Sequence, residues 1–519
     1  MTSPCCASSF DNWRISCRRI VKRKAKSCRT HYEHSQSPRQ IVTESANRDR
    51  QVDRADLIKY FDALAPARED WISRNWYYHE ELVRTLSFFI VADSSVLQIG
   101  SGTGALLNAL KPKRGVGLDF SSEMVNVARR TYPHLEFQVD DVENLKATER
   151  FDYVILSDVI GFLNDVQRSF ANLHQVCHRS TRILVTHFNF LWEPILQLSE
   201  RFGWKAKQPL LNWLTPYDIS NLLELAGFEM VRTVSRLLLP VHVPVLSALC
   251  NRFLVNLPVV KHLGLLQVMV ARPCREGATR PLSCTVVIPC RNERGNIASA
   301  VDRLPDIGSH TEIIFVEGAS TDGTKTEIER VIERHPNRDI KLLIQQGNGK
   351  GDAVRLGFAA AGGELLLILD GDLSVDPEEL PKFHDAIAKG AADFVQGSRL
   401  VYPIQDEAMR FLNLLGNRFF SIVFTYLLGQ HLKDTLCGTK VLLRSDYERI
   451  ATQRKYFGEL DPFGDFDLIF GAAKLSLKIL EIPIHYRARS YGVTNIRRFQ
   501  HGLLLLRMAW RAVWKMKFV

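Results

Sequence analysis

Short apolar runs alternate with amphipathic helical segments over two long stretches of the chain. In the first stretch a helical pattern begins at Tyr60, and strand-like runs follow at residues 94–104 (with a Gly-rich turn), 115–119, 135–140, 151–158, 181–188 and 265–271. In the second stretch the strand-like runs are residues 284–290, 311–318, 341–346, 364–372 and 393–398. Strands that alternate with helices predict a parallel sheet covered by helices on both faces. The pattern therefore predicts two α/β, Rossmann-like domains in tandem.

The composition of the remaining segments sets the expected domain boundaries. Residues 272–283 contain two prolines, a glycine and several charges, which is typical of a linker between domains. Residues 1–52 are rich in Ser, Arg, Lys and Cys without apolar periodicity, so we expect a disordered basic tail. We therefore expect domains at 53–271 and 284–498, and an amphipathic basic helix at 499–519. The domains are not an internal repeat, because their Gly and acid motifs differ.

The net charge of +10 belongs to the two ends of the chain. Residues 1–52 hold 11 Lys and Arg against 4 Asp and Glu, and residues 497–519 hold 6 Lys and Arg and no acid. Such ends suit anionic lipid or nucleic acid as partners. The overall composition, 46% hydrophobic and 24% charged, excludes wholesale disorder.

Other sequence features bear on the location of the protein. No stretch reaches the roughly 18 uncharged apolar residues of a membrane span, and the first residues lack the apolar core of a secretory signal. The ten cysteines show no paired metal-ligand spacing, which favours reduced thiols. We therefore expect a cytoplasmic protein that is not a multispanning membrane protein.

Three glycines directly after the first expected strand indicate a ligand-binding turn. Gly100, Gly102 and Gly104 alternate in GSGTG, where glycine permits positive φ and lets the backbone approach a ligand. The helix that follows points its free N–H groups at the crevice beyond the strand ends. Asp119 ends the next strand, where a carboxylate can bind both hydroxyls of a ribose, and Asp141 follows the third, beside the expected position of an adenine. This ordered series predicts a nucleotide-like cofactor.

The first stretch resembles the class I S-adenosylmethionine-dependent methyltransferases over roughly residues 60–271. The matching pieces are VLQIGSGTG, GLDFSSEMV, VDDVENL and FDYVILSDVI. The resemblance implies the class I methyltransferase fold with S-adenosylmethionine in the crevice. It implies Gly100 and Gly102 along the methionine and ribose side of the cofactor, Asp119 at the ribose hydroxyls and Asp141 at the adenine amino group. The family usually has an acid at the position of Gln98, which carries no charge.

The sequence does not define the methyl acceptor. Methyl transfer is a displacement that needs mainly proximity and a dry pocket. Asp158, His187 and Asn189 follow the fourth and fifth expected strands at the functional edge and could orient or deprotonate an acceptor. Each could equally be a helix cap or form a loop hydrogen bond, and the whole domain could bind a cofactor without catalysis.

Two acids separated by one glycine follow the apolar run ELLLIL in the second stretch. Asp370 and Asp372 can both face a divalent cation that carries the phosphates of a ligand. Hard oxygen ligands select Mg²⁺ or Mn²⁺, and such a metal neutralises charge on a leaving pyrophosphate. Upstream, three glycines surround Lys350 before a helix, which suits a phosphate-contacting loop. The spacing GxxxxGK[ST] is absent there, so a P-loop ATPase is disfavoured.

The second stretch resembles the family 2 glycosyltransferases with the GT-A fold, and among them the dolichyl-phosphate mannose synthase-like transferases. The matching pieces, over roughly residues 284–497, are VVIPCRNERGNI, FVEGASTDGT, NGKGDAVRLGF, LDGDLS, QGSR, DTLCGTKVLLRS, FGDFDL and IPIHYRARSYGVTNI. The resemblance implies a nucleotide-sugar donor and a polyprenyl-phosphate or other lipid-linked acceptor. The implied donor-site residues are Pro289, Glu293 and Glu317 at the base and ribose, Asp322 in the turn beside them, Lys350, Asp370, Asp372 and Arg399 at the diphosphate and metal, and Arg489 at a donor or acceptor phosphate.

The family inverts configuration and needs one carboxylate base on the acceptor side. The motif FGDFDL offers Asp467 first and Asp465 second. A phosphate acceptor is already ionised at pH 7, so this base would mainly orient it. Many relatives have two Asp before Gly-Ser-Thr-Asp-Gly where this chain has Glu317-Gly318-Ala319, so the preference for uridine or guanosine stays open.

Two segments favour contact with a membrane surface. Residues 409–429 are strongly apolar, and residues 497–519 interleave Leu, Met and Trp with Arg and Lys. Such a pattern suits a helix in a headgroup layer, and a core helix with a solvated basic face is the alternative. Neither domain shows a helix-turn-helix, RNP or zinc pattern, so we expect no nucleic-acid partner. We expect peripheral association with the inner face of the membrane.

Together these patterns predict a bifunctional enzyme. Its C-terminal half would be an inverting, metal-dependent glycosyltransferase, and its N-terminal half a methyltransferase on the same pathway. One alternative is that only the glycosyltransferase half is active and the other half is a docking or regulatory module. Another is a membrane-bound scaffold that binds nucleotides without turnover.

Overall fold

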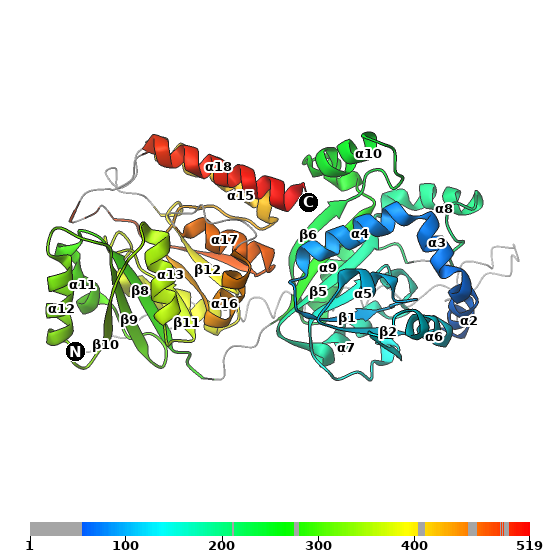
Figure 1. The fold of residues 1–519 in the computed structure, drawn as a ribbon, viewed down its shortest axis with the longest axis horizontal. Coiled ribbons are helices and arrows are strands. Elements are labelled where there is room, and N and C mark those ends of the chain that lie inside the picture. The colour runs from blue at the N-terminus through cyan, green and yellow to red at the C-terminus, as the bar shows by residue number, and fades with distance from the viewer. Residues whose placement is uncertain are drawn as a thin grey trace, which may run out of the picture. The chain divides into compact units, whose positions relative to one another are not determined.

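The computed structural model describes residues 54–209, 212–274, 280–402, 411–454, 464–487, 489, 491–492 and 498–518, without the side chains of 411–415 and 498–502. The chain divides into two units, Met1–Gln51 and Val52–Val519. The expected basic tail lies outside the described residues, and both α/β domains belong to the second unit (Figure 1).

The N-terminal domain is built on a seven-stranded sheet with the order β3-β2-β1-β4-β5-β7-β6. Its strands are β1 (Ser95–Ile99), β2 (Arg114–Asp119), β3 (Glu136–Val139), β4 (Phe151–Ser157), β5 (Cys177–Phe188), β6 (Phe228–Arg236) and β7 (Leu266–Pro273). β7 is antiparallel to β5 and β6, and the other neighbours are parallel. The strand order reverses between β1 and β4, so the loops after these strands open a crevice at their carboxyl ends.

Helices cover both faces of this sheet, because successive strand residues point to opposite sides. In β1, Val96 belongs to a core shared with α4, α5 and α6, whereas Leu97 belongs to a core shared with α7 and α9. The helices are α2 (Arg54–Leu64), α3 (Arg68–Arg74), α4 (Trp76–Phe89), α5 (Ala105–Leu110), α6 (Ser122–Thr131), α7 (Val166–Asn172), α8 (Glu193–Arg201), α9 (Pro216–Leu225) and α10 (Leu246–Ala248), with 3₁₀ turns that include η2 (Val142–Asn144) and η7 (Leu254–Asn256).

The C-terminal domain has a second seven-stranded sheet with the order β10-β9-β8-β11-β13-β12-β14. Its strands are β8 (Cys284–Cys290), β9 (Thr311–Glu317), β10 (Asp339–Ile344), β11 (Leu365–Ile368), β12 (Phe394–Ser398), β13 (Lys440–Leu443) and β14 (Ile479–Pro483). β13 is antiparallel to both of its neighbours, and the remaining pairs are parallel. The strand order reverses beside β8, which places the end of β11 next to the end of β8.

Helices also pack on both sides of the second sheet (Figure 1). α13 packs against β8 and β9, and α14 against β12 and β13. The helices are α11 (Arg294–Arg303), α12 (Thr324–Arg334), α13 (Lys350–Ala360), α14 (Pro381–Ala388), α15 (Phe411–Leu428), α16 (Arg444–Thr452), α17 (Asp465–Lys474) and α18 (Arg498–Lys517). One apolar core continues from α4 of the first domain into α15, α17 and α18 of the second.

Fully buried ion pairs join the two domains. Asp393, directly before β12, lies 2.7 Å from Arg182 of β5 and 2.8 Å from Arg272 of β7, and these three side chains are at most 1% exposed. Arg272 also contacts Glu229 of β6 at 2.6 Å, and Lys478 lies 2.8 Å from the same carboxylate. The junction is therefore a buried network of charges and not only an apolar contact.

The structure departs from the expected strands at three places. Both sheets are mixed, where the alternation of strands and helices predicted parallel sheets, and β6, β13 and β14 were not predicted. β6 has polar side chains at many of its positions, and β13 has only four residues, so neither gives a clear apolar run. β7 continues through Pro273, so Arg272 of the expected linker is a buried strand residue. Residues 275–279 of that linker lie outside the described residues.

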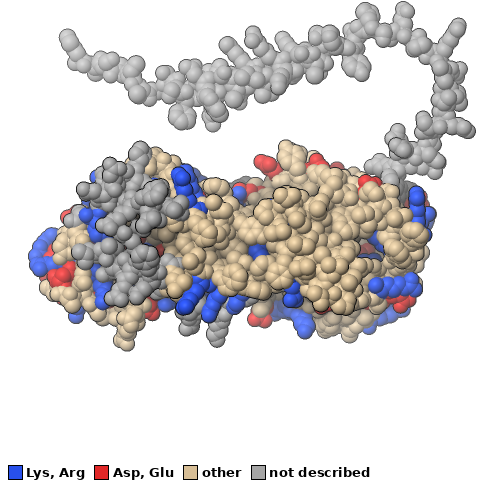
Figure 2. Space-filling view, turned by 90° about the horizontal axis from the view of Figure 1, so that it is seen from above, with Lys and Arg blue, Asp and Glu red and all other residues tan. Residues whose placement is uncertain are grey.

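The C-terminal helix has one buried and one exposed apolar side. Leu505, Met508 and Ala512 of α18 are buried, whereas Trp510 is 62% exposed. Figure 2 shows the face that lies at the top of Figure 1 and carries α10. This face has a broad area of residues other than Lys, Arg, Asp and Glu (tan), with Lys and Arg mainly at its borders. None of the helices in the described part of the chain is long and apolar enough to cross a membrane.

Candidate functional sites

The Gly-rich turn after β1 borders open space at the point where the strand order reverses. Gly100, Gly102 and Gly104 have positive φ angles of 65°, 53° and 86°. A Cβ on Gly100 would lie 2.3 Å from the side chain of Val159, and one on Gly104 would lie 2.5 Å from that of Phe137. A Cβ on Gly102 would meet nothing within 4 Å. A ligand can therefore approach the backbone at Gly102.

Asp119 lies buried beneath this turn and holds its shape. Its Oδ2 accepts a hydrogen bond from the Gly102 N–H at 2.8 Å, and its Oδ1 accepts one from the Ser121 N–H at 2.9 Å. Burial raises the pKa of the Asp119 carboxyl, and the two N–H groups oppose this rise. Each carboxylate oxygen has a further lone pair, so Asp119 can still accept bonds from ligand hydroxyls.

Polar atoms beside the turn provide a test of whether a polar cofactor fits. Among the described residues, Gln98 Oε1, Ser101 Oγ and Thr103 Oγ1 are buried and have no hydrogen-bond partner. Such atoms normally have partners in native proteins. A polar ligand on the turn would supply them, so these residues fit a cofactor such as S-adenosylmethionine. Gln98 would then contribute an amide where the family has an acid.

Asp141 is bound by α2, the first helix of the domain. Arg54 of α2 donates from Nε to Asp141 Oδ2 at 2.9 Å and from Nη2 to Oδ1 at 2.5 Å. Asp141 also accepts from the N–H of Glu143 at 3.1 Å and thereby caps η2. The Arg54 guanidinium lies 4.2 Å from the centre of the Phe120 ring. The carboxylate expected at an adenine is thus engaged by Arg54, which the sequence analysis missed because it lies far from every motif.

Asp158 is the best placed of the expected acceptor-side residues. It has a positive φ of 57°, and its carboxylate accepts hydrogen bonds from Tyr78 Oη at 2.7 Å and Thr186 Oγ1 at 3.1 Å. Burial raises the pKa of Asp158, and burial together with the Asp158 charge raises the pKa of Tyr78 well above its ordinary value. Tyr78 was not identified from the sequence, since it lies in an ordinary amphipathic helix.

The other two expected residues have different surroundings. His187 is buried, and burial lowers its pKa to about 4, so its imidazole is neutral at pH 7. Its Nε2 accepts from the N–H of Leu214 at 3.4 Å. Asn189 donates from Nδ2 to the carbonyls of His262 and Gly264 and accepts from Leu191, so it caps a turn. Asn189 therefore has a structural role in this domain.

In the second domain, the two acids after β11 carry different cations. Lys350 at the start of α13 lies 2.5 Å from Asp370, and Arg489 donates to Asp372 at 2.5 Å. Burial is the largest single effect and raises the pKa of the Asp370 carboxyl, but Lys350, Lys440 and Arg399 together bring it below the ordinary value. Burial also opposes the charge on Lys350, but Asp370 and Asp465 hold its pKa above the ordinary value. The expected phosphate-contacting lysine is therefore part of the acid site.

Glu293 lies beside the same cluster, directly before α11. Its Oε2 accepts from Asn296 at 2.7 Å, and its Oε1 lies 3.8 Å from Arg489. Burial raises the pKa of Glu293 to about 7. A Cβ on Gly371, between the two acids, would lie 2.9 Å from the carbonyl oxygen of Pro289 and 3.5 Å from Glu293. Pro289, Glu293 and the acid pair are therefore neighbours.

Glu317 and Asp322 hold the loop after β9. Glu317 is buried and accepts from the N–H of Ser320 at 2.5 Å. Asp322 accepts from the N–H of Arg294 at 3.1 Å and from Tyr491 Oη at 3.2 Å, and so ties this loop to the start of α11. These contacts fix the loops at the sheet edge where the sequence analysis predicts the nucleoside.

Arg399 is bound to an acid in the protein. Its guanidinium makes a two-point contact with Asp434, at 2.7 Å from Nε and 2.8 Å from Nη2. The guanidinium also lies 5.1 Å from the centre of the Tyr486 ring. Asp434 is fully buried, so Arg399 fixes the end of β12 beside the site.

The two acids of FGDFDL have separate partners. Asp465 Oδ1 lies 2.7 Å from Nζ of Lys440, and Asp467 Oδ2 accepts from Arg454 Nε at 2.8 Å. The side chain of Lys440 is fully buried. A Cβ on Gly464 would lie 2.8 Å from the backbone of Gly351, so the start of α17 abuts the start of α13. Asp465 therefore belongs to the acid site, together with a buried lysine.

The acid pair has part of the chemistry of a metal site. Within the described residues, no group of three or more His, Cys, Asp or Glu could hold a metal. Mg²⁺ is commonly bound by one or two carboxylates together with substrate phosphates and water. Asp370 and Asp372 have this chemistry, and cations already lie against both. The pair therefore fits a metal that arrives with a diphosphate and does not form a complete protein cage.

Two family models match the chain. The model described as glycosyl transferase family 2 matches residues 285–451, and the model described as a methyltransferase domain matches residues 96–180. The first range contains the DGD motif, and the second begins at β1 and contains the Gly-rich turn.

Curated relatives are sugar transferases. The chain is 27% identical over 224 residues to glycosyltransferase AglJ of Haloferax volcanii, which covers 43% of this chain and 69% of the relative. It is 28% identical over 222 residues to dolichol-phosphate mannosyltransferase of Pyrococcus furiosus, with 42% and 60% covered. It is 28% identical over 224 residues to polyprenol monophosphomannose synthase of Mycolicibacterium smegmatis, with 42% and 82% covered.

Solved structures are similar to each part at low scores. Magnesium protoporphyrin IX methyltransferase of Synechocystis with bound SAH is 16% identical with a TM-score of 0.32, covering 43% of this chain and 100% of that one. Glucosyl-3-phosphoglycerate synthase of Mycobacterium tuberculosis with Mn²⁺ and UDP is 17% identical with a TM-score of 0.34, covering 45% and 80%. The family models therefore find a methyltransferase domain and a family 2 glycosyltransferase domain in one enzyme chain, each on its own seven-stranded α/β sheet.

Proposed function

We propose that the C-terminal domain transfers a sugar from a nucleotide-sugar to a polyprenyl-phosphate or other lipid-linked acceptor, with inversion at the anomeric carbon. The observation that carries this proposal is the cluster of Asp370, Asp372, Lys350 and Arg489 at the end of β11. A diphosphate leaving group requires paired acids that hold a metal and cationic side chains that contact its phosphates. Three relatives with such acceptors in their names support it.

Residues of the site divide between the donor's parts. Asp370 and Asp372 would hold Mg²⁺ or Mn²⁺, which neutralises charge on the departing diphosphate. Lys350 and Arg489, now paired with these acids, would turn to the phosphates. Pro289, Glu293 and Glu317 would face the nucleoside, with the loop fixed by Asp322, and Arg399 would keep β12 in place through Asp434.

The acceptor side is assigned to Asp465. It lies next to buried Lys440 and contributes to the electrostatic environment of Lys350, whereas Asp467 contacts Arg454. An ionised phosphate acceptor needs no proton removed, so Lys440 would attract it and Asp465 would fix the ammonium group. This choice reverses the order that the sequence motif favoured.

Donor binding tests the proposal directly. Binding of UDP-, GDP- and dTDP-sugars to the full chain is measured with Mg²⁺ or Mn²⁺, for the wild type, Asp372→Asn and the surface control Asp385→Asn. We expect one donor class to bind with metal, and Asp372→Asn to weaken it by about tenfold or more, as for a charged contact worth ~1.4 kcal/mol or more. Equal binding by wild type and Asp372→Asn would contradict the assignment.

We also propose that the N-terminal domain binds S-adenosylmethionine and methylates an acceptor near Asp158 and Tyr78. Gly102 offers open backbone, Asp119 offers acceptors for ribose hydroxyls, and Gln98 offers an amide. Calorimetric titration with S-adenosylmethionine, for the wild type and Asp119→Asn, tests the cofactor site. Binding without turnover of any acceptor would favour the alternative of a docking or regulatory module.

Peripheral contact with a membrane surface is part of this proposal, since a polyprenyl chain resides in lipid. Residues 241–263 and α18 expose large apolar side chains, with Val245 at 85%, and Phe253 lies 6.3 Å from Trp514 between ring centres. Co-sedimentation with phosphatidylglycerol vesicles measures this contact, and we expect Val245→Asp and Trp510→Asp to weaken it.

A further inference from the structure

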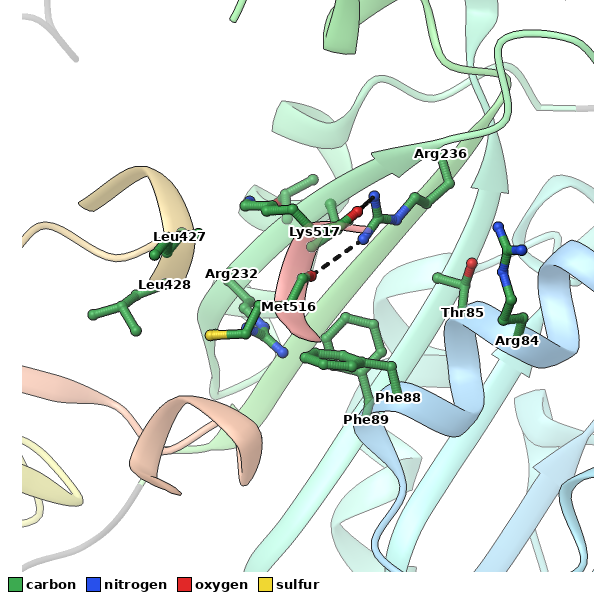
Figure 3. A pocket seen from close by; sticks show the side chains of 13 residues that line it. Arg84, Thr85, Phe88, Phe89, Arg232, Arg236, Leu427, Leu428, Met516 and Lys517 are labelled. Atoms are coloured by element: carbon green, nitrogen blue, oxygen red, sulfur yellow. Dashed lines mark hydrogen bonds between the residues drawn. The ribbon is translucent and has the colours of Figure 1, made fainter. Parts of the chain in front are cut away.

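A pocket at the junction of the two domains is lined by basic and apolar side chains and by no acid. Its walls come from α4 and β6 of the first domain and from the ends of α15 and α18 of the second (Figure 3). Four basic residues line it, Arg84, Arg232, Arg236 and Lys517. The space open to the centres of water-sized groups is about 30 Å³, which admits only a small ligand.

Arg232 lines this pocket with hydrogen-bond donors that have no acceptor. The residue is 5% exposed, and its Nε and Nη2 have no hydrogen-bond partner within the described part of the chain. The guanidinium carbon lies 4.5 Å from the centre of the Phe89 ring and 5.5 Å from that of Phe88. The aromatic rings orient the guanidinium but accept neither hydrogen bond. Nε and Nη2 form the edge with which arginine makes two-point contacts to carboxylates and phosphates.

The hydrogen bonds of the neighbouring Arg236 bring no anion close to the Arg232 guanidinium. Arg236 donates to Asn256 Oδ1 at 2.9 Å, and none of its hydrogen-bond acceptors is an anion. Its other acceptors are the carbonyls of Lys517 at 3.0 Å and Met516 at 3.4 Å (Figure 3). Arg84, by contrast, lies 2.5 Å from Glu81.

The electrostatic consequence is a cluster of cations that repel one another. Burial and then the charge of Arg236 lower the pKa of Arg232 to about 9. Burial, followed by Arg236 and Arg232, lowers the pKa of Lys517 to about 7. Glu81 offsets part of the charge of Arg84 and Arg236. Burying Arg232 and Lys517 without a counter-charge of their own is costly, and an anion in the pocket would remove that cost.

We propose that this pocket binds a small phosphate-class oxyanion, held by the free guanidinium edge of Arg232 together with Arg236 and Lys517. The space excludes a nucleotide, so the ligand is inorganic phosphate or a terminal phosphomonoester that enters as a headgroup. Because the binding groups come from both domains, the anion stabilises their docked arrangement. None of the residues that line the pocket belongs to the Gly-rich turn or the DGD motif, so this proposal does not rest on the activities proposed for those sites.

The test uses thermal unfolding of the full chain in phosphate against chloride at equal ionic strength. We expect phosphate at about 100 times its Kd to raise the Tm of the wild type by a few degrees. Arg232→Met keeps an unbranched stem on Phe89 and removes the charge and both donors. We expect this variant to lose the phosphate-dependent rise and to be at least as stable as the wild type without phosphate. Arg511→Gln, on the exposed side of α18, removes the same charge elsewhere and should keep the rise.

Two further arms identify the source of the phosphate. Vesicles with phosphatidic acid present a terminal phosphomonoester, and phosphatidylcholine vesicles are the control. Arg232-dependent binding to phosphatidic acid without a response to inorganic phosphate assigns the ligand to a lipid, and a response to inorganic phosphate assigns it to the free ion. The proposal is overturned if neither ligand depends on Arg232. It is also overturned if Arg232→Met is less stable than the wild type in phosphate-free buffer, because the guanidinium then acts as a structural contact.

Discussion

Asp370 and Asp372 lie two residues apart, yet the fold gives each a different cation. Lys350 reaches Asp370 from α13, and Arg489 reaches Asp372 from the segment after β14. In the proposed function, each ion pair would supply one group to the metal and one to the phosphates of a donor. Donor binding would exchange these internal pairs for contacts to ligand, which keeps the buried acids compensated in both states.

Asp465 and Asp467 allow a matched comparison within one helix. We expect Asp465→Asn to lower sugar transfer by about 10²-fold or more, because the variant releases the buried ammonium of Lys440 beside the acid site. Asp467→Asn should keep most of the activity, since Asp467 contacts Arg454. Transfer rates at saturating donor and the Tm of both variants measure this. The reverse order of effects would support the assignment that the motif FGDFDL first favoured.

Glu293 should give the stability of the protein a pH dependence. Its folded-state pKa of about 7 is above the ordinary value of 4.5, because burial disfavours the carboxylate. The contribution of Glu293 is therefore fully present below pH 4.5 and is lost as the pH rises through about 7. We expect the wild type to lose up to ~3 kcal/mol relative to Glu293→Gln between pH 4.5 and 8. Chemical unfolding of both proteins across this range measures it, and parallel pH profiles would contradict the assignment.

The residues that could be predicted belong to continuous motifs. The glycines of GSGTG, Asp119 and the DGD pair were found because each lies directly after an apolar run. The partner of Asp372 could not be found in this way, because Arg489 is 117 residues away. Lys440 looked like an ordinary surface residue, since a single lysine before VLL gives no sign that it is buried beside an acid.

At the scale of elements, α2 covers the crevice of the N-terminal domain through a few side chains. Arg54 binds Asp141, and Asp62 accepts from Ser121 Oγ at 2.5 Å. The Phe61 ring contacts those of Phe120 and Phe162 at centroid distances of 5.4 and 5.2 Å. α2 thus covers Asp141, the residue at which the sequence analysis predicts an adenine.

Loosening α2 should change cofactor affinity. In Arg54→Gln the Asp141 carboxylate is released for an adenine amino group, so we expect S-adenosylmethionine to bind severalfold more tightly. Calorimetric titration measures this, with Lys59→Gln on the exposed side of the same helix as the control. Weaker binding in Arg54→Gln alone would show that Arg54 helps to hold the cofactor.

Elements were predicted well where apolar runs were strong. β8 begins and ends at the expected residues, whereas β6 was missed because polar residues interrupt its apolar pattern. The antiparallel strands β7 and β13 could not be recognised as antiparallel, because an apolar run carries no information about strand direction.

At the scale of the whole molecule, Asp393 joins the two domains. It is fully buried between Arg182 and Arg272, so removing its charge leaves two buried guanidinium groups without their shared partner. We expect Asp393→Asn to destabilise the protein by ~3–5 kcal/mol. Chemical unfolding followed by intrinsic fluorescence measures this, with Asp385→Asn on the surface of α14 as control. A difference between Asp393→Asn and wild type below about 1 kcal/mol would show that the network contributes little.

The junction was not foreseen, because Arg182, Arg272 and Asp393 lie in three separate stretches of sequence and none belongs to a motif. Such a junction makes the two domains parts of one folded unit, consistent with Val52–Val519 forming a single compact body. Through this junction the methyltransferase domain can stabilise the glycosyltransferase domain without transferring a methyl group. Asp393→Asn therefore also tests the alternative that the methyltransferase domain is a docking module.

Sugar transfer to a lipid acceptor is the most direct test of the proposed function. The full chain is incubated with polyprenyl phosphate, Mn²⁺ or Mg²⁺ and each labelled nucleotide-sugar, and the lipid phase is analysed for product. We expect one donor to yield a polyprenyl-phosphate sugar of inverted anomeric configuration, and Asp372→Asn to abolish it while Asp385→Asn does not. Failure of every donor to label the lipid, with donor binding intact, would contradict a polyprenyl-phosphate acceptor.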